Sequence, residues 1–188
     1  MNLLTGLFSV FTDISKWEID NILTLISIFL VIVGSGFAYK QWSTSNKIKR
    51  TEFINQIIEK LRFDEDMVST MYIVEYAYDW YDENFHANKD GLEYSIDKLL
   101  SYLSYICYIY KLRNITNKEF RILRYELNRV CSSPAVQSYL WNLYHFSKGQ
   151  EIECTFQYLI DYGIKNKIIN KENFNNHAFS GYPKYLNF

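Results

Sequence analysis

The stretch NILTLISIFLVIVGSGFAYKQW, residues 21–42, decides the fold of this chain. From Ile22 to Tyr39 it contains no charged residue. At about 1.5 Å of rise per residue, a helix over this run reaches roughly 27 Å, close to the hydrocarbon thickness of a bilayer. Trp17 precedes the run and Trp42 follows it, and such amphipathic rings favour the two membrane interfaces. The stretch therefore predicts one transmembrane helix.

Two other interpretations of this stretch stay open. A buried helix of a soluble protein would usually be shorter, and a domain of this size could hardly surround it. A cleaved signal peptide should begin with basic residues, but residues 2–15 contain no Lys or Arg. The small residues of GSGFA, at 34–38, nevertheless make an acceptable cleavage site.

Basic residues lie almost entirely on one side of the apolar run. Lys16 is the only one before it, and four follow it: Lys40, Lys47, Lys49 and Arg50. Because cytoplasmic flanks carry the excess of Lys and Arg, we expect a single pass through the inner membrane with the C-terminal part in the cytoplasm. The outer segment, residues 1–20, is expected to lie on the membrane surface through Leu3, Leu4, Leu7, Phe8 and Phe11.

Small residues within the span indicate self-association. Gly34 and Ala38 are one helical turn apart, and such pairs allow two helices to approach closely in a membrane. Ser27 and Ser35 are candidates for hydrogen bonds between helices. The sequence therefore predicts a homo-oligomer in contact with membrane lipid.

The composition excludes several classes of protein. The net charge is −1, so bulk electrostatics predict no nucleic-acid partner. Glycine and proline are scarce, at 7 and 2 residues, which favours long helices. Asn, Ile, Lys and Tyr are abundant, and their AT-rich codons indicate an AT-rich bacterium or a mobile element.

The odd number of widely spaced cysteines predicts neither a disulfide framework nor a zinc site: Cys107, Cys131 and Cys154.

Helical periodicity continues after the span and predicts an all-α fold. The apolar stripe at 53–61 should extend the first helix to about Arg62, because no Gly or Pro separates the two. Asp64 is a candidate N-cap for the next helix. Its inward residues are expected to be Met67, Met71, Val74 and Tyr78. A loop, DENFHANKDG, should follow.

The central helix is expected at about 91–112. Its segment LLSYLSYICYIY is apolar or aromatic on nearly every face, so other helices should surround it. TNKEF offers Thr116 and Glu119 as a capping box, and CSSPAV offers Ser133 and Pro134 as the start of another helix.

A last helix is expected from about Glu153 to Tyr162, ended by Gly163. Residues 43–164 would then form a cytosolic helical domain. Residues 165–188 form a polar tail whose aromatic residues should dock on the domain or on a partner: Phe174, Phe179, Tyr182, Tyr185 and Phe188.

One acidic stripe is a candidate for chemistry. Glu75, Asp79 and Glu83 would stack on one helix face, with Asp82 beside them. Glu83 and His86 have the spacing of half a di-iron site. No second motif of this kind faces them, so we expect a solvated surface, with no catalytic, cofactor-binding or metal-binding residue. A membrane-tethered nuclease or metal-dependent hydrolase using these residues is the alternative.

Other catalytic motifs are absent from the sequence. There is no G-x-S-x-G and no Gly-rich phosphate loop. Helical HEPN ribonucleases use Arg and His at R-x4–6-H spacing, and no arginine here has a histidine at that distance. We therefore expect a non-enzymatic protein.

The stretch LLSYLSYICYIYKLRNITNKEFRILRYELNRVCSSPAVQSYLWNLYHFS resembles a domain of unknown function in small bacterial proteins. The resemblance covers residues 21–147, through the YICYIY helix, the TNKEF helix start and the VQSYLWNLYHF helix. It implies one N-terminal span, a cytosolic helical domain and a role among mobile-element or phage-defence genes. The arrangement is also similar to the membrane accessory protein of type VI-B CRISPR systems, which assembles into a pore. That family has an HEPN-like Arg/His motif, which this chain lacks.

These observations predict a membrane-anchored helical protein that acts by binding an unknown protein partner or by self-assembly, as an antiviral defence accessory or effector.

Overall fold

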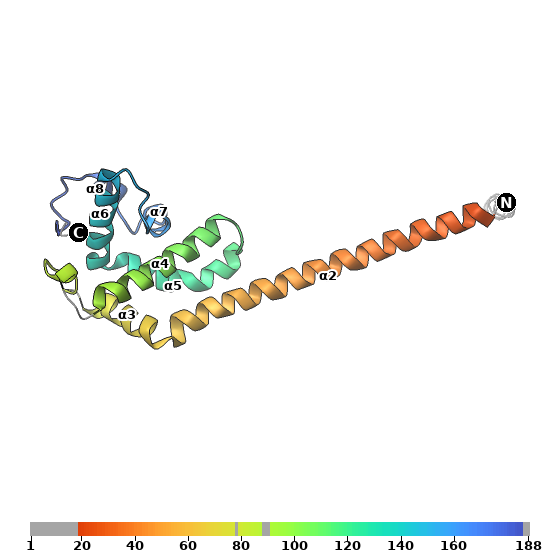
Figure 1. The fold of residues 1–188 in the computed structure, drawn as a ribbon, viewed down its shortest axis with the longest axis horizontal. Coiled ribbons are helices and arrows are strands. Elements are labelled where there is room, and N and C mark those ends of the chain that lie inside the picture. The colour runs from red at the N-terminus through yellow and green to blue at the C-terminus, as the bar shows by residue number, and fades with distance from the viewer. Residues whose placement is uncertain (1–18, 78, 88–90, 186–188) are drawn as a thin grey trace, which may run out of the picture. The chain divides into compact units, whose positions relative to one another are not determined.

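The computed structural model describes residues 19–77, 79–87 and 91–185, with side chains from residue 21. These residues form helices and no strand, which confirms the all-α prediction (Figure 1). The chain divides into two compact units, Met1–Thr51 and Glu52–Phe188. The helices are α2 (Ile19–Phe63), α3 (Glu65–Tyr76), η1 (Phe85–Ala87), α4 (Leu92–Lys111), α5 (Asn117–Ser132), α6 (Pro134–Gly149), α7 (Gln157–Lys165) and α8 (Lys171–Asn175).

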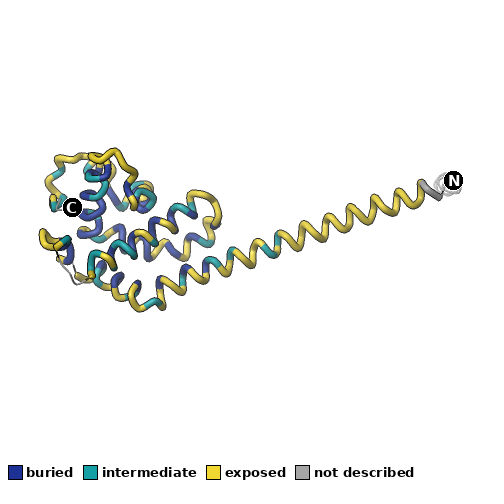
Figure 2. Tube along the Cα trace, viewed as in Figure 1, coloured by how far each residue is buried: buried dark blue, intermediate teal, exposed yellow. Residues whose placement is uncertain are grey.

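The first unit contains the apolar part of α2. The helix is unbroken from Ile19 to Phe63, as the lack of Gly and Pro near residue 50 predicts. Asn21–Phe63 is long and apolar enough to cross a membrane, with a mean hydropathy of 2.3 over its best 18 residues and none of them buried. Figure 2 shows α2 exposed over the whole apolar run, and every residue from 21 to 42 is exposed. A buried core helix of this chain is therefore excluded. Trp17 and the amphipathic segment predicted before it lie outside the described residues.

The second unit begins with the last turns of α2 and with α3. Ile54, Ile57 and Leu61 of α2 are buried, as their apolar stripe predicts. Asp64 caps α3 by accepting a hydrogen bond from the Met67 amide at 3.1 Å. The predicted inward residues Met67, Met71 and Val74 are buried, and Tyr78 lies outside the described residues.

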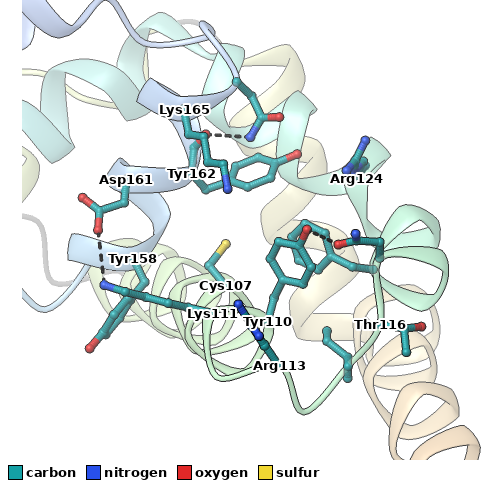
Figure 3. Close-up of a pocket in the computed structure, with 14 residues that line it drawn as sticks. Cys107, Tyr110, Lys111, Arg113, Thr116, Arg124, Tyr158, Asp161, Tyr162 and Lys165 are labelled. Atoms are coloured by element: carbon teal, nitrogen blue, oxygen red, sulfur yellow. Dashed lines mark hydrogen bonds and ion pairs between the residues drawn. The ribbon is translucent and has the colours of Figure 1, made fainter.

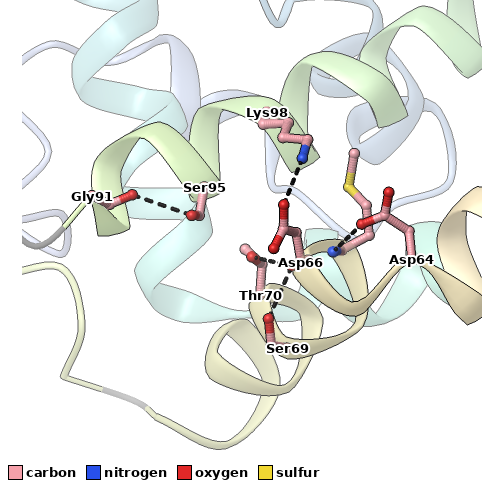
Figure 4. A network of polar contacts seen from close by, with 8 residues as sticks. Asp64, Asp66, Ser69, Thr70, Gly91, Ser95 and Lys98 are labelled. Carbon is pink, nitrogen blue, oxygen red and sulfur yellow. Dashed lines mark hydrogen bonds and ion pairs between the residues drawn. The ribbon is translucent and has the colours of Figure 1, made fainter.

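A polar contact joins α3 to α4 (Figure 4). The Lys98 ammonium of α4 binds the Asp66 carboxylate of α3 at 3.0 Å. The backbone carbonyl of Asp66 accepts hydrogen bonds from Thr70 at 2.6 Å and Ser69 at 3.1 Å. Because the Asp66 carboxylate is largely exposed, the ion pair orients the two helices more than it stabilises them.

Helix α4 lies at the centre of the domain, as its apolar and aromatic segment at 99–110 predicts, although Tyr94, Ser101 and Tyr105 form an exposed strip along it. It contacts α3, α5, α7 and η1. Its buried side chains face all of these neighbours: Ile96, Leu99, Leu100, Leu103, Ser104, Ile106, Cys107 and Ile109. The helix begins after Gly91, whose φ of 75° is a conformation that glycine adopts without strain.

The starts of α5 and α6 confirm the capping predictions. Thr116 and Glu119 form a complete capping box, with the Thr116 amide donating to Glu119 Oε2 at 2.7 Å. Ser133 caps α6, and Pro134 occupies its first turn. The capping residues satisfy amides that have no partner within the helix, so local sequence is sufficient to place these two boundaries.

The predicted end of the last helix is wrong. Gly163 lies inside α7, which spans Gln157–Lys165, and does not end it. A Cβ at Gly163 would lie 2.5 Å from Ile169 Cδ1, so the missing side chain provides room for Ile169 to pack on the helix. The helix ends instead at Asn166, which is the C-cap. Close packing, and not a turn, explains this glycine.

The segment after α7 docks on the domain. Phe174 of α8 is fully buried, and its carbonyl accepts a hydrogen bond from His145 Nε2 of α6 at 2.9 Å. Tyr182 stacks near Trp141, with ring centroids 5.6 Å apart. Tyr185 is partly buried against the core. Of the two predicted docking places for these aromatic residues, the structure shows the domain; Phe188 lies outside the described residues.

Candidate functional site

The predicted acidic face does not form. Helix α3 ends at Tyr76, because Ala77 is extended at φ −94° and ψ 92°. Glu75 forms an ion pair with Arg129 of α5, whereas Asp79 and Glu83 are exposed beyond the end of α3. His86 Nδ1 instead lies 2.7 Å from Glu93 Oε1. The prediction that positions 75, 79 and 83 stack on one helix face is therefore wrong.

Buried aromatic rings explain why the helix stops. Trp80, Tyr81 and Phe85 pack together with ring centroids 5.4 to 5.7 Å apart and also contact Tyr139 of α6. A helix through residues 77–86 would bring these rings out of that cluster. In the described parts of the chain, no group of three or more His, Cys, Asp and Glu side chains is placed to hold a metal ion.

The exposed surface of the apolar part of α2 is the first feature with functional meaning. Phe29, Leu30 and Val31 are 62%, 63% and 67% exposed. Tyr39 and Trp42, which follow the apolar run, are also exposed, with their rings 6.1 Å apart. A continuous apolar surface of this length is what a lipid-facing helix presents.

The small residues of this helix face open space. Nothing lies within 4 Å of a Cβ built at Gly34 or Gly36. The Ser27 hydroxyl, a predicted donor between helices, donates to the Leu23 carbonyl of its own helix at 2.8 Å. Ser27 is therefore satisfied without a second helix, and contact between copies would depend on the small residues.

The second feature is a pocket of about 720 Å³ within the helical domain, formed by α4, α5, α7 and the connection from α4 to α5 (Figure 3). Its volume lies in the roughly 300–1,000 Å³ range typical of small-ligand sites. Its lining residues are Cys107, Tyr110, Lys111, Arg113, Ile115, Thr116, Asn117, Phe120, Arg124, Tyr158, Asp161, Tyr162, Lys165 and Asn166.

The charge of this pocket differs from that of the whole chain. It contains four basic side chains and one acidic one, whereas the chain has a net charge of −1. Figure 3 shows the basic groups around the opening, from three helices and one connection. They are Lys111 of α4, Arg113 of the connection, Arg124 of α5 and Lys165 of α7.

Among the described residues, only one of these four cations lies within 4 Å of a carboxylate. Lys111 lies 3.9 Å from Asp161, with both side chains about half exposed or more. Within the described residues, Arg113, Arg124 and Lys165 have no carboxylate within 4 Å. The pocket therefore has a local positive potential that favours an anion.

Aromatic rings form the wall of the pocket. Tyr110 stacks on Phe120 with centroids 3.8 Å apart and an interplanar angle of 5°. The Tyr110 hydroxyl donates to Asn117 Oδ1 at 2.5 Å, which fixes the ring. Tyr110 is partly buried, Phe120 covers one of its faces, and the ring lines the pocket.

Burial raises the pKa values of two polar groups that line the pocket and are already neutral at pH 7. Desolvation raises the pKa of the Cys107 thiol, which is therefore protonated at neutral pH and a weak nucleophile. Burial also raises the pKa of Tyr162 to about 12, and its hydroxyl donates to Asn128 Oδ1 at 2.7 Å. These groups shape the pocket and supply no charge of their own.

Arg113 follows the C-terminus of α4 in a left-handed conformation that is uncommon for a residue other than glycine. Its φ is 61°, and its amide donates to the Tyr110 carbonyl while the Asn114 amide donates to the Ile109 carbonyl. This is the Schellman arrangement, in which glycine usually occupies the residue with positive φ. Glu151 and Lys167 have the same conformation after α6 and α7, so this backbone feature belongs to these helix ends and not to the pocket.

Sequence reasoning missed this pocket. Its cations are separated by up to 54 positions in the chain and share no motif or helix face. A cation in the last turn of a helix is also common for a local reason, the helix dipole, so Lys111 and Lys165 carry little signal in the sequence. Only the packing of α4, α5 and α7 brings the four together.

Comparisons with known proteins do not place this chain in a family. No family model matches it, and neither curated proteins nor solved structures give a match. The fold and the two surfaces are therefore the basis for any functional conclusion.

Proposed function

We propose that this chain is a single-pass protein of a bacterial cytoplasmic membrane that acts through binding and self-assembly and not through catalysis. Residues 1–20 lie outside in this proposal, and the helical domain lies in the cytoplasm. The observation that carries it is the unburied apolar run of α2, of which none of the best 18 residues is covered by the chain.

The apolar surface of α2 is costly to leave in water. Apolar surface in water costs about 25 cal/mol per Å², and soluble monomers rarely expose more than a few hundred Å² in one patch. Every described residue from 21 to 42 is exposed. A bilayer removes this surface from water while the helix satisfies its own backbone hydrogen bonds. Lipid is therefore the proposed partner of this helix.

The orientation is supported by charge alone. Lys40, Lys47 and Lys49 are exposed on the C-terminal side of the apolar run, and Arg50 is partly exposed beside them. Lys16 is the only basic residue on the other side. The positive-inside bias then favours a cytoplasmic C-terminus.

Protease protection tests this topology. A C-terminal tag on the full chain should fractionate with membranes, resist protease added to spheroplasts and be digested after lysis. An N-terminal tag should remain on the chain, whereas its loss with a shortened mature chain would show a cleaved signal peptide. Lys40→Gln with Lys47→Gln and Lys49→Gln should make a fraction of the C-terminal tag accessible. A soluble tag, or one digested in intact spheroplasts, contradicts the proposal.

Self-association through the face of Gly34 and Ala38 is the second part of the proposal. Lipid tails are as apolar as leucine, so close packing at small residues must supply the attraction between helices. Gly34→Leu creates no clash within the chain, because a Cβ there meets nothing within 4 Å. The matched control is Gly36→Leu, which is equally open but lies two residues away and so on another helix face.

Cross-linking in membranes measures how far each of these variants still forms oligomers. Gly34→Leu with Ala38→Leu should reduce the oligomer bands, and Gly36→Leu should keep them. Equal bands from the two variants would show that the span is an anchor only.

The resemblance to small phage-defence proteins supports one biological version of this function, an accessory or effector in antiviral defence that binds a protein partner. Expression of the chain with its neighbouring genes should lower the plating efficiency of phage, and Gly34→Leu with Ala38→Leu should restore it. Unchanged plating with the intact chain would contradict this version and leave the membrane topology unaffected.

A further inference from the structure

We propose that the pocket formed by α4, α5 and α7 binds a nucleoside polyphosphate, with its cations on the phosphates and Tyr110 stacked on the base. This goes beyond the proposed function, because it assigns a ligand to the helical domain alone and holds for either membrane orientation. The sequence has no phosphate-binding loop, so the site would be built from side chains and not from backbone amides.

The arginines give the pocket its phosphate chemistry. A guanidinium presents several N–H donors in one plane and matches two phosphate oxygens at once. Arg113 and Arg124 come from different elements and, with Lys165, have no carboxylate within 4 Å among the described residues. These three cations line one cavity, and the several negative charges of a polyphosphate match such a set.

Helix ends add no net positive charge to the pocket. The N-terminus of α5, at Thr116 and Asn117, lines the pocket, but the Glu119 carboxylate of the capping box offsets its partial positive charge. The C-termini of α4 and α7 would contribute negative ends, but Lys111 and Lys165 lie in their last turns. The dipole explains these two lysines without a ligand. It does not explain Arg124, which lies in the middle of α5.

The aromatic wall distinguishes a nucleotide from a bare anion. Bases stack on tyrosine faces in single-stranded nucleic-acid sites, because every base has a π-face. Tyr110 lines the cavity and is partly buried, with Phe120 stacked on one face and its hydroxyl bound to Asn117. Inorganic phosphate or a lipid headgroup would use the cations and leave this ring unused.

Arg113→Gly is a clean test because it should not harm the fold. Glycine is the residue that a positive φ favours, so the substitution relieves backbone strain while removing the guanidinium. Lys167→Gly is the matched control. It removes one positive charge and the same strain from an exposed residue that does not line the pocket.

The measurement is titration of the purified full chain in detergent micelles with ATP. Lys167→Gly should bind ATP within about twofold of the wild type. Arg113→Gly should bind at least tenfold more weakly, which corresponds to about 1.4 kcal/mol. Equal affinity of the two variants would show that ATP binds elsewhere and would overturn the proposal, as would the absence of saturable binding by the intact chain.

Three further ligands separate the sources of affinity. Adenosine and inorganic triphosphate should each bind at least tenfold more weakly than ATP, because each engages only part of the site. Triphosphate as tight as ATP would overturn the role of Tyr110, as would tight binding that survives Tyr110→Leu. Tyr110→Phe keeps the ring and should retain ATP binding.

Lipid headgroups are tested by competition. Displacement of ATP by micelles containing phosphatidylglycerol at low micromolar lipid would assign the pocket to lipid headgroups and overturn the proposal of a nucleotide ligand.

Discussion

Leucines behave in opposite ways in the two units of this protein. Leu30 of α2 is 63% exposed, whereas Leu103 of α4 is fully buried. Both lie in helices with apolar residues on nearly every face. The difference shows that such a helix needs an apolar environment but does not specify which one. Lipid is the proposed environment of the first, and the other helices of the domain surround the second.

The largest effect is expected from removing a central core side chain. Leu103→Ala should lower the free energy of unfolding of the domain by about 3–5 kcal/mol, because a cavity forms where no solvent enters. Leu30→Ala, the same change in the other unit, should leave it unchanged. Denaturant titration of the full chain in detergent, followed by tyrosine and tryptophan fluorescence, measures both. Similar losses for the two variants would contradict the contrast between the units.

A charge in the middle of the apolar run should impair membrane insertion and leave the stability of the domain unchanged, the opposite of a core substitution. Leu30→Arg should cost about 3 kcal/mol of membrane insertion while the domain keeps its stability. Ile122→Arg is the control, since Ile122 is an exposed apolar residue of the domain at 47%. Carbonate extraction of membranes should release a larger share of the Leu30 variant only. Full membrane retention of that variant would count against the span.

Glycines in the two units should respond differently to an added methyl group. Gly163→Ala should destabilise the domain by about 1–3 kcal/mol, because the new Cβ would lie 2.5 Å from Ile169 Cδ1. Gly34→Ala meets nothing within 4 Å and should not change domain stability. The same denaturant titration reads out both variants. A neutral Gly163→Ala would mean that Ile169 moves away without loss.

The smallest effect concerns pH. Burial, the largest cause, lowers the pKa of His145 below its ordinary value of 6.5. The hydrogen bond to the Phe174 carbonyl opposes this shift, and the nearby charges of His177, Lys148 and Lys184 add to it. The unfolded chain therefore binds a proton more readily than the folded one, and domain stability should fall as pH drops below about 6.5. Membrane association should not follow, since residues 22–38 contain no titratable side chain.

Two variants isolate this histidine. His145→Gln should reduce the loss of stability between pH 7.5 and pH 5.5, while its amide can still donate to the Phe174 carbonyl. His177→Gln should keep most of the loss, because burial of His145 remains. Free energies of unfolding at the two pH values provide the measurement, and identical pH slopes for wild type and His145→Gln would show that other groups dominate.

Much of the fold follows from local sequence. Asp64, Thr116 and Ser133 mark helix starts because their side chains satisfy amides within three residues, without help from distant parts of the chain. The central place of α4 follows from the apolar and aromatic residues of its segment at 99–110. The prediction of an acidic helix face was wrong because distant contacts decide the structure there. Trp80 and Tyr81 pack against Tyr139, which is almost 60 positions away in the chain, and α3 ends before them.

The sequence by itself determined the apolar run of α2, the helical class and the capped helix starts. Each depends on composition or on contacts between residues a few positions apart. Only the tertiary structure decided that Gly163 lies within α7, that Phe174 docks on the domain, and that Arg113, Arg124 and Lys165 surround one pocket. These features arise between helices whose order in the chain does not reveal their packing, because side-chain shape and burial select one arrangement among many with the same pattern.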